Sequence, residues 1–299
     1  MLRMSLTGVM APLPTPFDRE GRLDIGALQR ALRHWVASPL RGFVMLGSNG
    51  EAVMLDEDES DRVISVAREI VPVGRPLLAG VGRESTEATV RAAQRAAALG
   101  ADAVLVRTPG FFKAQMSAEA FERHYTEIAD RTPVPVLLYN FTAVTGVDLT
   151  PPVVARLSGH PNIIGMKESG GDVARIAELV GRTPPEFIVL AGSANTFYPS
   201  LLMGAAGGVL ALACVVPDAC VRLFELVEQG RHDDARALQR RLAPLGRLLG
   251  SVYGVPGLKA ALALVGVDVG SPRPPLLSLS EPGVAALTEA LTAFKEVTA

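Results

Sequence analysis

The chain has 299 residues, of which 48% are hydrophobic, enough to bury one large core or two smaller domains. A net charge of −2 gives no basic surface of the kind that binds nucleic acid, so we expect no nucleic-acid partner. Two cysteines and four scattered histidines exclude a disulfide framework and show no zinc-ligand spacing, so we expect no metal.

The N-terminal stretch MLRMSLTGVMAPLPTPF lacks the continuous apolar segment of a secretory signal, and its prolines interrupt the apolar residues it has. Further along, charges, glycines and prolines break each apolar stretch before it reaches a membrane-spanning length. We therefore expect a soluble, cytoplasmic protein without a membrane partner.

Eight short apolar runs with strand-forming residues recur along the first two thirds of the chain. They are GVMAPL near residue 8, GFVMLG near 42, PLLAGVG near 76, ADAVLV near 101, VPVLLYN near 134, NIIGMK near 162, FIVLAGS near 187 and GGVLALA near 207. Helical segments lie between these runs. Segments 24–37 and 56–70 are predicted helices, and a third begins after an N-cap at Ser85 and stops at Gly100.

Apolar strands that alternate with helices predict parallel strands covered on both faces. Eight such units predict a (β/α)8 barrel, or TIM barrel, over residues 1–215. A doubly wound sheet is the alternative, but it should carry a dinucleotide-binding fingerprint, and GVGRES at 80–85 has only the first two glycines.

After residue 215 the alternation stops. The remaining predicted helices are 217–229, 231–250, 256–265 and 281–297. We therefore expect residues 216–299 to form a helical C-terminal extension packed on the barrel.

Active sites of such barrels lie at the C-terminal ends of the strands. Four predicted strands end there in polar residues, namely GSNGE at 47–51, YN at 139–140, KES at 167–169 and GSAN at 192–195. Each stretch also has an ordinary explanation as a turn, a half-buried tyrosine or a helix cap. Their common placement favours a single site, because four strands would aim hydroxyls, amides and one amine at the same point.

Lys167 ends an apolar strand in a chain where only four of the 29 Lys and Arg residues are lysines. Arginine carries the same surface charge, so a lysine that remains is a candidate for chemistry that needs an amine. Guanidinium stays protonated and is no nucleophile, whereas a desolvated ammonium can lose its proton and attack a carbonyl. The alternative is a lysine that only extends from a strand edge into water.

These residues fit an enzyme that forms an imine with a 2-oxo acid. Lys167 would supply the amine, and Tyr139 would relay protons. The hydroxyl and backbone N–H groups of Ser48, Asn49 and Gly50 would hold the substrate carboxylate. Such chemistry requires no metal and no organic cofactor, only the covalent imine on Lys167.

With these motifs the sequence resembles the superfamily of dihydrodipicolinate synthases and N-acetylneuraminate lyases, which are pyruvate-dependent class I aldolases. The shared motifs extend over most of the chain and are TPF, GSNGE, AGVG, VRTP, LLYN followed by TG, and GMKES. Within the superfamily the chain looks most similar to 4-hydroxy-2-oxoglutarate aldolase, through ESTEATV, HPNIIGMKESGGDVARI, VLAGSA, GAAGGVLALA and GVPGLK. The resemblance implies a homo-oligomer, expected to be a tetramer of tight dimers.

The resemblance also implies a role for single residues in binding pyruvate. Lys167 matches the Schiff-base lysine and Tyr139 the proton relay. Ser48 and Asn49 would bind the pyruvyl carboxylate, and Val209 would form the wall of the pocket on the eighth strand.

For the other half of the substrate, the resemblance implies that Ser169 and Gly192 approach the distal carboxylate or the aldehyde. Dihydrodipicolinate synthases carry an arginine in the loop after YN that binds the semialdehyde carboxylate, and this chain has Val144 there. Because valine offers no donor, we expect an aldolase that cleaves 4-hydroxy-2-oxoglutarate to pyruvate and glyoxylate. A dihydrodipicolinate synthase-like condensation, or another pyruvate-dependent lyase or dehydratase, stays open as an alternative.

A second departure lies after TP, where many relatives have a tyrosine that completes a hydroxyl relay, often across a subunit contact. This chain has Phe111 and Phe112 in TPGFFK. The relay must then use water or Ser48, or the activity is reduced or altered. A barrel that binds a 2-oxo acid without turning it over is therefore a further alternative, although a binding protein has no need of Lys167.

Overall fold

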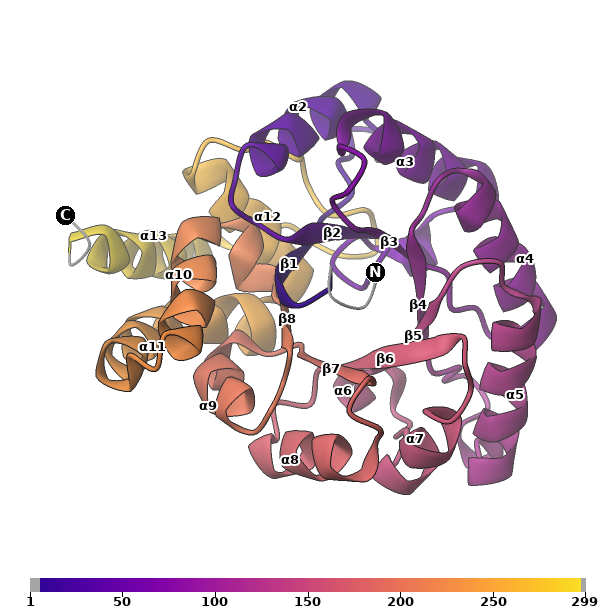
Figure 1. Cartoon of the computed structure of the whole chain (residues 1–299). Helices are drawn as coiled ribbons and strands as arrows, with labels where there is room; N and C mark the ends of the chain where they lie inside the picture. Colours follow the sequence, from indigo (N-terminus) through magenta and orange to yellow (C-terminus); the bar gives the residue numbers. More distant parts are fainter. Residues whose placement is uncertain (1–5, 297–299) are drawn as a thin grey trace.

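The computed structural model of the chain describes residues 6–296. Eight parallel strands close into one barrel in chain order, and β8 pairs back to β1 (Figure 1). The strands are β1 (Gly8–Pro12), β2 (Gly42–Met45), β3 (Leu77–Gly80), β4 (Ala103–Arg107), β5 (Val136–Asn140), β6 (Ile163–Glu168), β7 (Ile188–Ala191) and β8 (Gly207–Val209). The predicted (β/α)8 barrel is confirmed. The last apolar run is shorter as a strand than predicted, because the chain turns into a 3-10 helix at Ala211–Cys214.

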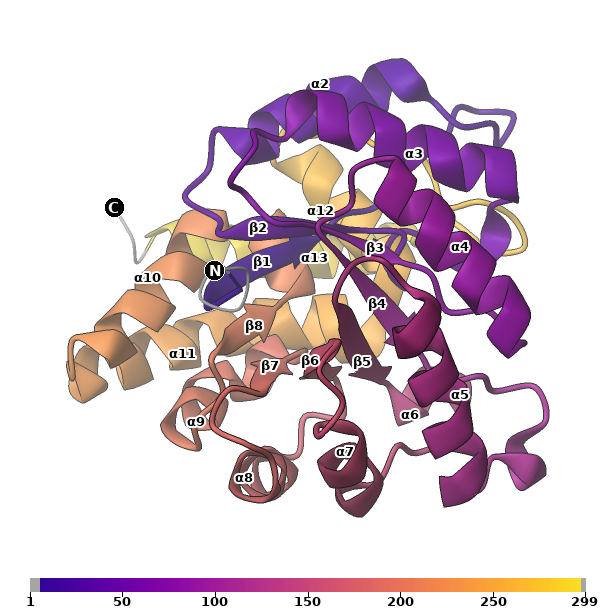
Figure 2. The same cartoon turned by 45° about the vertical axis from the view of Figure 1, so that its right-hand side comes forward.

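Helices surround the barrel (Figures 1 and 2). They are α2 (Ile25–Val36), α3 (Glu57–Ile70), α4 (Thr86–Ala98), α5 (Ala118–Arg131), α6 (Thr142–Thr145), α7 (Pro151–Leu157), α8 (Val173–Arg182), α9 (Phe197–Leu202), α10 (Pro217–Glu228), α11 (His232–Arg247), α12 (Gly254–Leu264) and α13 (Glu281–Glu296). None of these helices is long and apolar enough to cross a bilayer. The predicted N-cap of α4 is confirmed, since the Ser85 hydroxyl accepts from the N–H of Ala88 at 3.2 Å.

The four helices predicted after residue 215 correspond to α10–α13. The second helix, predicted over 231–250, ends earlier than expected. Helix α11 stops at Arg247, and Leu248–Val252 form a π-helical turn. Helix α11 packs against α10 and α13, and these helices lie at one side of the barrel in Figure 1. Residues 1–5 of the predicted barrel segment and residues 297–299 of the predicted extension lie outside the described residues. The last residue of the predicted helix 281–297 lies outside them as well. The division at residues 215 and 216 stays a prediction.

Side chains alternate along the strands between two cores. On β5, Val136 and Leu138 pack towards the helices, whereas Leu137 and Tyr139 belong to the smaller core inside the barrel. A strand exposes successive side chains on opposite faces, so two apolar layers require a nearly continuous apolar sequence. This requirement explains why the strands could be recognised as apolar runs.

Strand β6 breaks the alternation with a β-bulge. Ile163 pairs with Val136 on β5, but the next pairing joins Gly165 to Leu137. Ile164 is therefore an extra residue on β6, and its side chain lies in the core inside the barrel.

The bulge determines the direction of Lys167. Beyond it, Lys167 pairs with Tyr139 on β5 and Leu190 on β7, and both partners face the inside of the barrel. With strict alternation from Ile163, which faces the helices, Lys167 would also face the helices. One inserted residue thus turns the amine towards the barrel axis.

Gly165, next to the bulge, is expected to be essential for the packing of β6 on β7. A Cβ there would lie 2.5 Å from the carbonyl oxygen of Ile188. Gly165→Ala should lower the free energy of unfolding by about 1–3 kcal/mol, because the backbone must shift to admit the methyl group. Urea unfolding followed by circular dichroism measures the change.

Gly181→Ala is the matched control. Gly181 lies near the end of α8, and a Cβ added to it would meet nothing within 4 Å, so alanine should stabilise the protein by up to about 1 kcal/mol. Equal stability of the two variants would contradict the close approach of β6 and β7.

Candidate active site

A cavity of about 1400 Å³ opens at the C-terminal ends of the strands. All predicted site residues except Gly50 line it. These are Ser48, Asn49, Tyr139, Lys167, Ser169, Gly192 and Val209. Gly50 lies behind the turn, where its N–H donates to the carbonyl of Gly47 and its carbonyl accepts a 2.6 Å hydrogen bond from Thr15. The turn itself thus uses the N–H of Gly50, and a role of Gly50 in binding the substrate stays a prediction.

Lys167 is a buried amine, with 6% of its surface exposed. Its Nζ lies 4.5 Å from the centre of the Tyr139 ring. Among residues 6–296 no side-chain carboxylate forms an ion pair with Lys167. Its sequence neighbour Glu168 points to the opposite side of the strand and pairs with Arg175. The amine thus faces the cavity without a counter-ion.

Two hydroxyl groups lie close to each other in the cavity that Lys167 also lines. The oxygens of Tyr139 and Ser48 are 3.2 Å apart and share a hydrogen bond in which either can donate. Tyr139 comes from β5 and Ser48 from the turn after β2, so the bond joins two strand ends across the cavity. Such a pair can pass a proton from one oxygen to the other.

The turn after β2 presents two unused donors. The N–H groups of Ser48 and Asn49 donate to no group within the described part of the chain. Leu46 and Glu51, at the two ends of the turn, both have left-handed backbone angles, with φ of 55° and 54°. Such angles are unfavourable for residues other than glycine and are typical of functional loops. The arrangement forms a small backbone concavity suited to a carboxylate.

Gly80 at the end of β3 makes room for this turn. A Cβ on Gly80 would lie 2.0 Å from the carbonyl oxygen of Leu46, which no side chain can tolerate. The first glycine of the AGVG motif, Gly80, is thus required because the backbones of β3 and of the turn approach each other closely.

A buried ion pair holds the end of the same turn. Glu51 Oε1 lies 2.7 Å from Nζ of Lys259 on α12, and both side chains are almost fully buried. Lys259 also donates to the carbonyls of Thr15 and Ser271, at 2.8 and 2.9 Å. Burial lowers the pKa of Lys259, and the bond to Glu51 opposes part of that shift. The C-terminal helices therefore fix the turn that carries Ser48 and Asn49.

Arg273 extends this contact. Its N–H donates to Glu51 Oε2 at 2.8 Å, and its guanidinium makes two short bonds to the carboxylate of Glu59, at 2.6 and 2.5 Å. The charged groups of Arg273 and Lys259 lie 4.3 and 4.4 Å from the centre of the Phe17 ring. The cluster joins residues from both ends of the chain.

A second polar cluster lies behind β5 and β6. Glu168 accepts from Arg175 at 2.8 Å, from the side chain of Asn140 at 2.9 Å and from the N–H of Gly170 at 2.7 Å. Arg175 also bonds Asp148. Since Asn140 follows Tyr139 and Glu168 follows Lys167, this cluster fixes the strand ends that carry Tyr139 and Lys167.

Ser169 and Gly192 lie against each other. A Cβ on Gly192 would lie 2.0 Å from the hydroxyl oxygen of Ser169, so only glycine leaves room for that hydroxyl. The N–H of Gly192 donates to the carbonyl of Glu168 at 2.7 Å. Gly192 therefore shapes the cavity, and its N–H is not free to bind a substrate.

The loop with the two phenylalanines lies at the mouth of the cavity. Glu84 accepts from the N–H groups of Gly110 and Phe111 at 3.0 and 2.9 Å and pairs with Arg107 at 2.9 Å. Burial would raise the pKa of Glu84, but these bonds outweigh it and the pKa is lowered. Phe111 lines the cavity and is 77% exposed.

Three cationic side chains that line the cavity were missed by the sequence analysis. They are Arg83, Arg107 and Lys113. The stretch GVGRES indicates a turn between a strand and a helix, but no local pattern shows which of its side chains enters a cavity.

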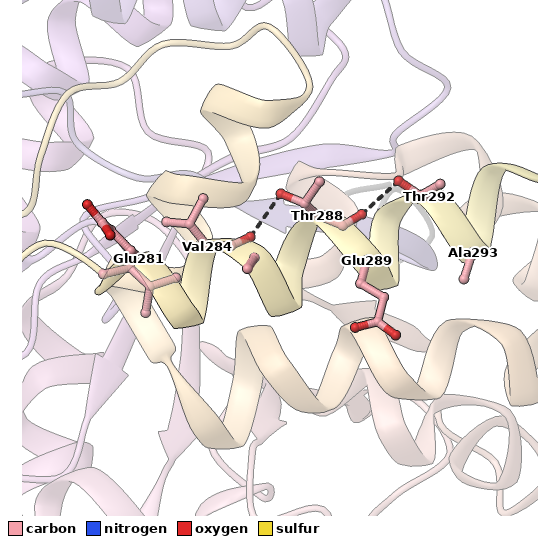
Figure 3. Close-up of a pocket in the computed structure, with 8 residues that line it drawn as sticks. Glu281, Val284, Thr288, Glu289, Thr292 and Ala293 are labelled. Atoms are coloured by element: carbon pink, nitrogen blue, oxygen red, sulfur yellow. Dashed lines mark hydrogen bonds between the residues drawn. The ribbon is translucent and has the colours of Figure 1, made fainter.

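A second hollow, of about 750 Å³, lies along α13 (Figure 3). It is lined by Leu279, Glu281, Val284, Ala285, Thr288, Glu289, Thr292 and Ala293. The Thr288 and Thr292 hydroxyls donate to carbonyls of their own helix, at 2.9 and 2.8 Å. No predicted site residue lines this hollow. Within residues 6–296 no group of three or more His, Cys, Asp and Glu side chains is placed to hold a metal ion.

Comparison with known proteins gives one family. A model of the Dihydrodipicolinate synthetase family matches residues 5–294. A 4-hydroxy-tetrahydrodipicolinate synthase of Xanthomonas axonopodis pv. citri is 38% identical over 277 residues, which are 93% of this chain and 91% of that protein. A protein of Emericella nidulans named "Probable 4-hydroxy-2-oxoglutarate aldolase, mitochondrial" is 34% identical over 295 residues, with 97% of this chain and 95% of that protein covered.

Among solved structures, the chain is similar to YagE, a prophage protein of the dihydrodipicolinic acid synthase family from E. coli K12, in complex with pyruvate. The TM-score is 0.91 at 29% identity, and the match covers 97% of this chain and 99% of YagE.

Removing the buried cation is expected to be costly. Lys259→Met leaves the Glu51 carboxylate buried without its ion-pair partner, which should lower the free energy of unfolding by about 3–5 kcal/mol. Adding Glu51→Gln should recover part of this loss, because no uncompensated charge then remains. The midpoint of urea unfolding measures both changes.

The control is Arg182→Met on α8. Its ion pair with Glu178 is solvent-exposed, so the loss should stay below about 0.5 kcal/mol. A Lys259→Met protein as stable as this control would show that the buried pair does not hold the turn in place.

Proposed function

The chain belongs to the dihydrodipicolinate synthetase family, and on that premise we propose that it is a pyruvate-dependent lyase that works through an imine on Lys167. The observation that carries the proposal is the buried amine of Lys167, which lies 4.5 Å from the Tyr139 ring and lines the same cavity as the hydroxyl pair of Tyr139 and Ser48.

Imine formation would begin with the uncharged amine. Nζ of Lys167 attacks the C2 carbonyl of a 4-hydroxy-2-oxo acid, and loss of water leaves an iminium in place of the ketone. The free N–H groups of Ser48 and Asn49 hold the neighbouring C1 carboxylate. Val209 and the inner core form the apolar wall around the imine.

Cleavage then follows between C3 and C4. The hydroxyl pair of Tyr139 and Ser48 takes the proton of the 4-hydroxyl, C4 becomes the aldehyde carbon, and the bonding electrons pass to the iminium nitrogen to give an enamine. Protonation at C3 and hydrolysis of the imine release pyruvate and restore Lys167. The same steps in reverse join pyruvate to an aldehyde.

Two candidate activities differ in the aldehyde that is released or joined to pyruvate. We favour the cleavage of 4-hydroxy-2-oxoglutarate to pyruvate and glyoxylate, because Val144 lines the cavity and has no donor for a semialdehyde carboxylate. Condensation of pyruvate with aspartate semialdehyde is the second candidate. It is favoured by the comparisons, since the Xanthomonas synthase is 38% identical to the chain and the Emericella aldolase 34%.

Exposed apolar side chains support the expected homo-oligomer. Phe111, Phe112 and Val144 are 77%, 64% and 60% exposed. Contact with a second copy would remove this apolar surface from water. The tetramer and the cytoplasmic location stay predictions.

Borohydride reduction in the presence of pyruvate is expected to trap one adduct per chain, on Lys167. Intact mass spectrometry counts the adduct, and peptide mapping locates it. Lys167→Arg should abolish it, because guanidinium does not form the imine. Lys295→Arg on α13 is the control and should keep the full adduct. An adduct on Lys113 or Lys259 would contradict the assignment.

The wild-type protein is expected to release pyruvate from 4-hydroxy-2-oxoglutarate and to condense aspartate semialdehyde poorly. Val144→Arg should raise kcat/KM for the condensation about 10- to 100-fold, because a hydrogen bond to a charged group contributes about 1.5–3 kcal/mol. A coupled dehydrogenase assay measures pyruvate release, and product formation measures the condensation.

Val144→Met adds bulk without a donor and serves as the control for this comparison. It should leave the condensation unimproved and imine trapping intact. If the wild type condensed aspartate semialdehyde efficiently and released no pyruvate from 4-hydroxy-2-oxoglutarate, the aldolase proposal would be wrong and the synthase activity would be favoured.

A further inference from the structure

We propose that Arg83 recognises the distal carboxylate of the substrate, the group for which Val144 supplies no donor. This inference rests on the proposed function, in which a 4-hydroxy-2-oxo acid is cleaved at Lys167. It adds a residue on the loop after β3 to the substrate-binding side chains and limits the chemical class of the substrate.

Arg83 lines the same cavity as Lys167. Its N–H donates to the hydroxyl of Thr89 on α4 at 3.0 Å, which fixes the backbone from which the side chain extends. The guanidinium makes one long hydrogen bond, 3.4 Å from Nη1 to the carbonyl of Gly82. Within residues 6–296 no carboxylate forms an ion pair with it. Most of its five donors are therefore free to meet a ligand.

The other cationic side chains of the cavity have different roles or partners. Arg107 is neutralised by Glu84 at 2.9 Å. Lys113 is exposed at the rim, and Lys167 is the amine that forms the imine. Among the described residues that line the cavity, Arg83 is thus the guanidinium that forms no ion pair.

The surroundings of Arg83 favour an anion. Burial lowers the pKa of Arg83, the charge of Arg107 adds to that shift, and the charge of Glu57 opposes part of it. Gly82, which precedes Arg83, lies against Arg107, since a Cβ on Gly82 would lie 2.6 Å from Cγ of Arg107. A carboxylate between them and the imine would offset the repulsion and could accept two parallel N–H bonds from Arg83.

The proposal predicts which substrates are accepted. An aldehyde half with a carboxylate, such as glyoxylate, satisfies Arg83. A neutral aldehyde half leaves a half-buried guanidinium without an acceptor, and a site built for a polar group discriminates against analogues that lack it. The enzyme should therefore prefer dicarboxylic 2-oxo acids to neutral, sugar-like ones.

Two ligands of equal chain length test the proposal. 2-Oxoglutarate ends in a carboxylate and 2-oxopentanoate in a methyl group, and calorimetry on the full-length protein gives Kd for each. Arg83→Met should weaken 2-oxoglutarate binding about 10- to 100-fold, and Arg83→Lys should weaken it less. Binding of 2-oxopentanoate and of pyruvate should change by less than about twofold.

Arg91→Met is the matched control. Arg91 is exposed on α4, and its loss changes the net charge by the same amount, so all three Kd values should stay unchanged. If Arg83→Met weakened all three ligands alike, Arg83 would have only a structural role, and the proposal would be overturned. An unchanged ratio of the two Kd values would overturn it as well.

Failure of the proposed function gives a different result. Absence of a pyruvate adduct on Lys167, or of pyruvate release from 4-hydroxy-2-oxoglutarate, would overturn the aldolase. The Kd ratio for the two five-carbon ligands would still decide the role of Arg83, because calorimetry requires no turnover.

Discussion

The orientation of Lys167 depends on Ile164, the one residue by which β6 exceeds its partner strand. Because side chains on a strand alternate, the insertion turns the amine inwards and Glu168 outwards. The amine then faces the cavity that Tyr139 and Ser48 also line, while the carboxylate bonds Arg175 on α8. A single irregularity in the ladder therefore places Lys167 and Glu168, which are neighbours in sequence, in two environments, one in the cavity and one against the helices.

The loops around the amine are held by buried charges rather than by apolar packing. Glu51 with Lys259 fixes the turn after β2, and Glu168 with Arg175 fixes the ends of β5 and β6. A buried ion pair adds little net stability, but removal of one partner is strongly unfavourable. Such pairs therefore specify one conformation of a loop, and this is what the backbone concavity at Ser48 requires.

Much of this architecture could be predicted from the sequence, because apolar strands, helix caps and polar strand ends leave local patterns. The placement of Lys167 and Tyr139 at neighbouring strand ends in one cavity could be predicted for the same reason, whereas their roles stay predictions. The bulge at Ile164 could not, since a continuous apolar strand looks the same in either register. Two further features could not be predicted, namely the hydrogen bonds that the Gly50 and Gly192 N–H groups make within the protein and the position of Arg83 in the cavity wall. Both depend on contacts between loops, and a local sequence pattern does not show such contacts.

The cluster around Glu51 also sets an order of events during synthesis. Its partner Arg273 follows it by 222 residues. At a synthesis rate of about 5–20 residues per second, roughly 10–45 s pass between the appearance of the two residues at the ribosome. The strands from β3 to β8 are all made within that interval, whereas Lys259 and Arg273, which both bond Glu51, come after the last strand. The turn that carries Ser48 and Asn49 can thus reach its final contacts only after residues 259 and 273 have been translated.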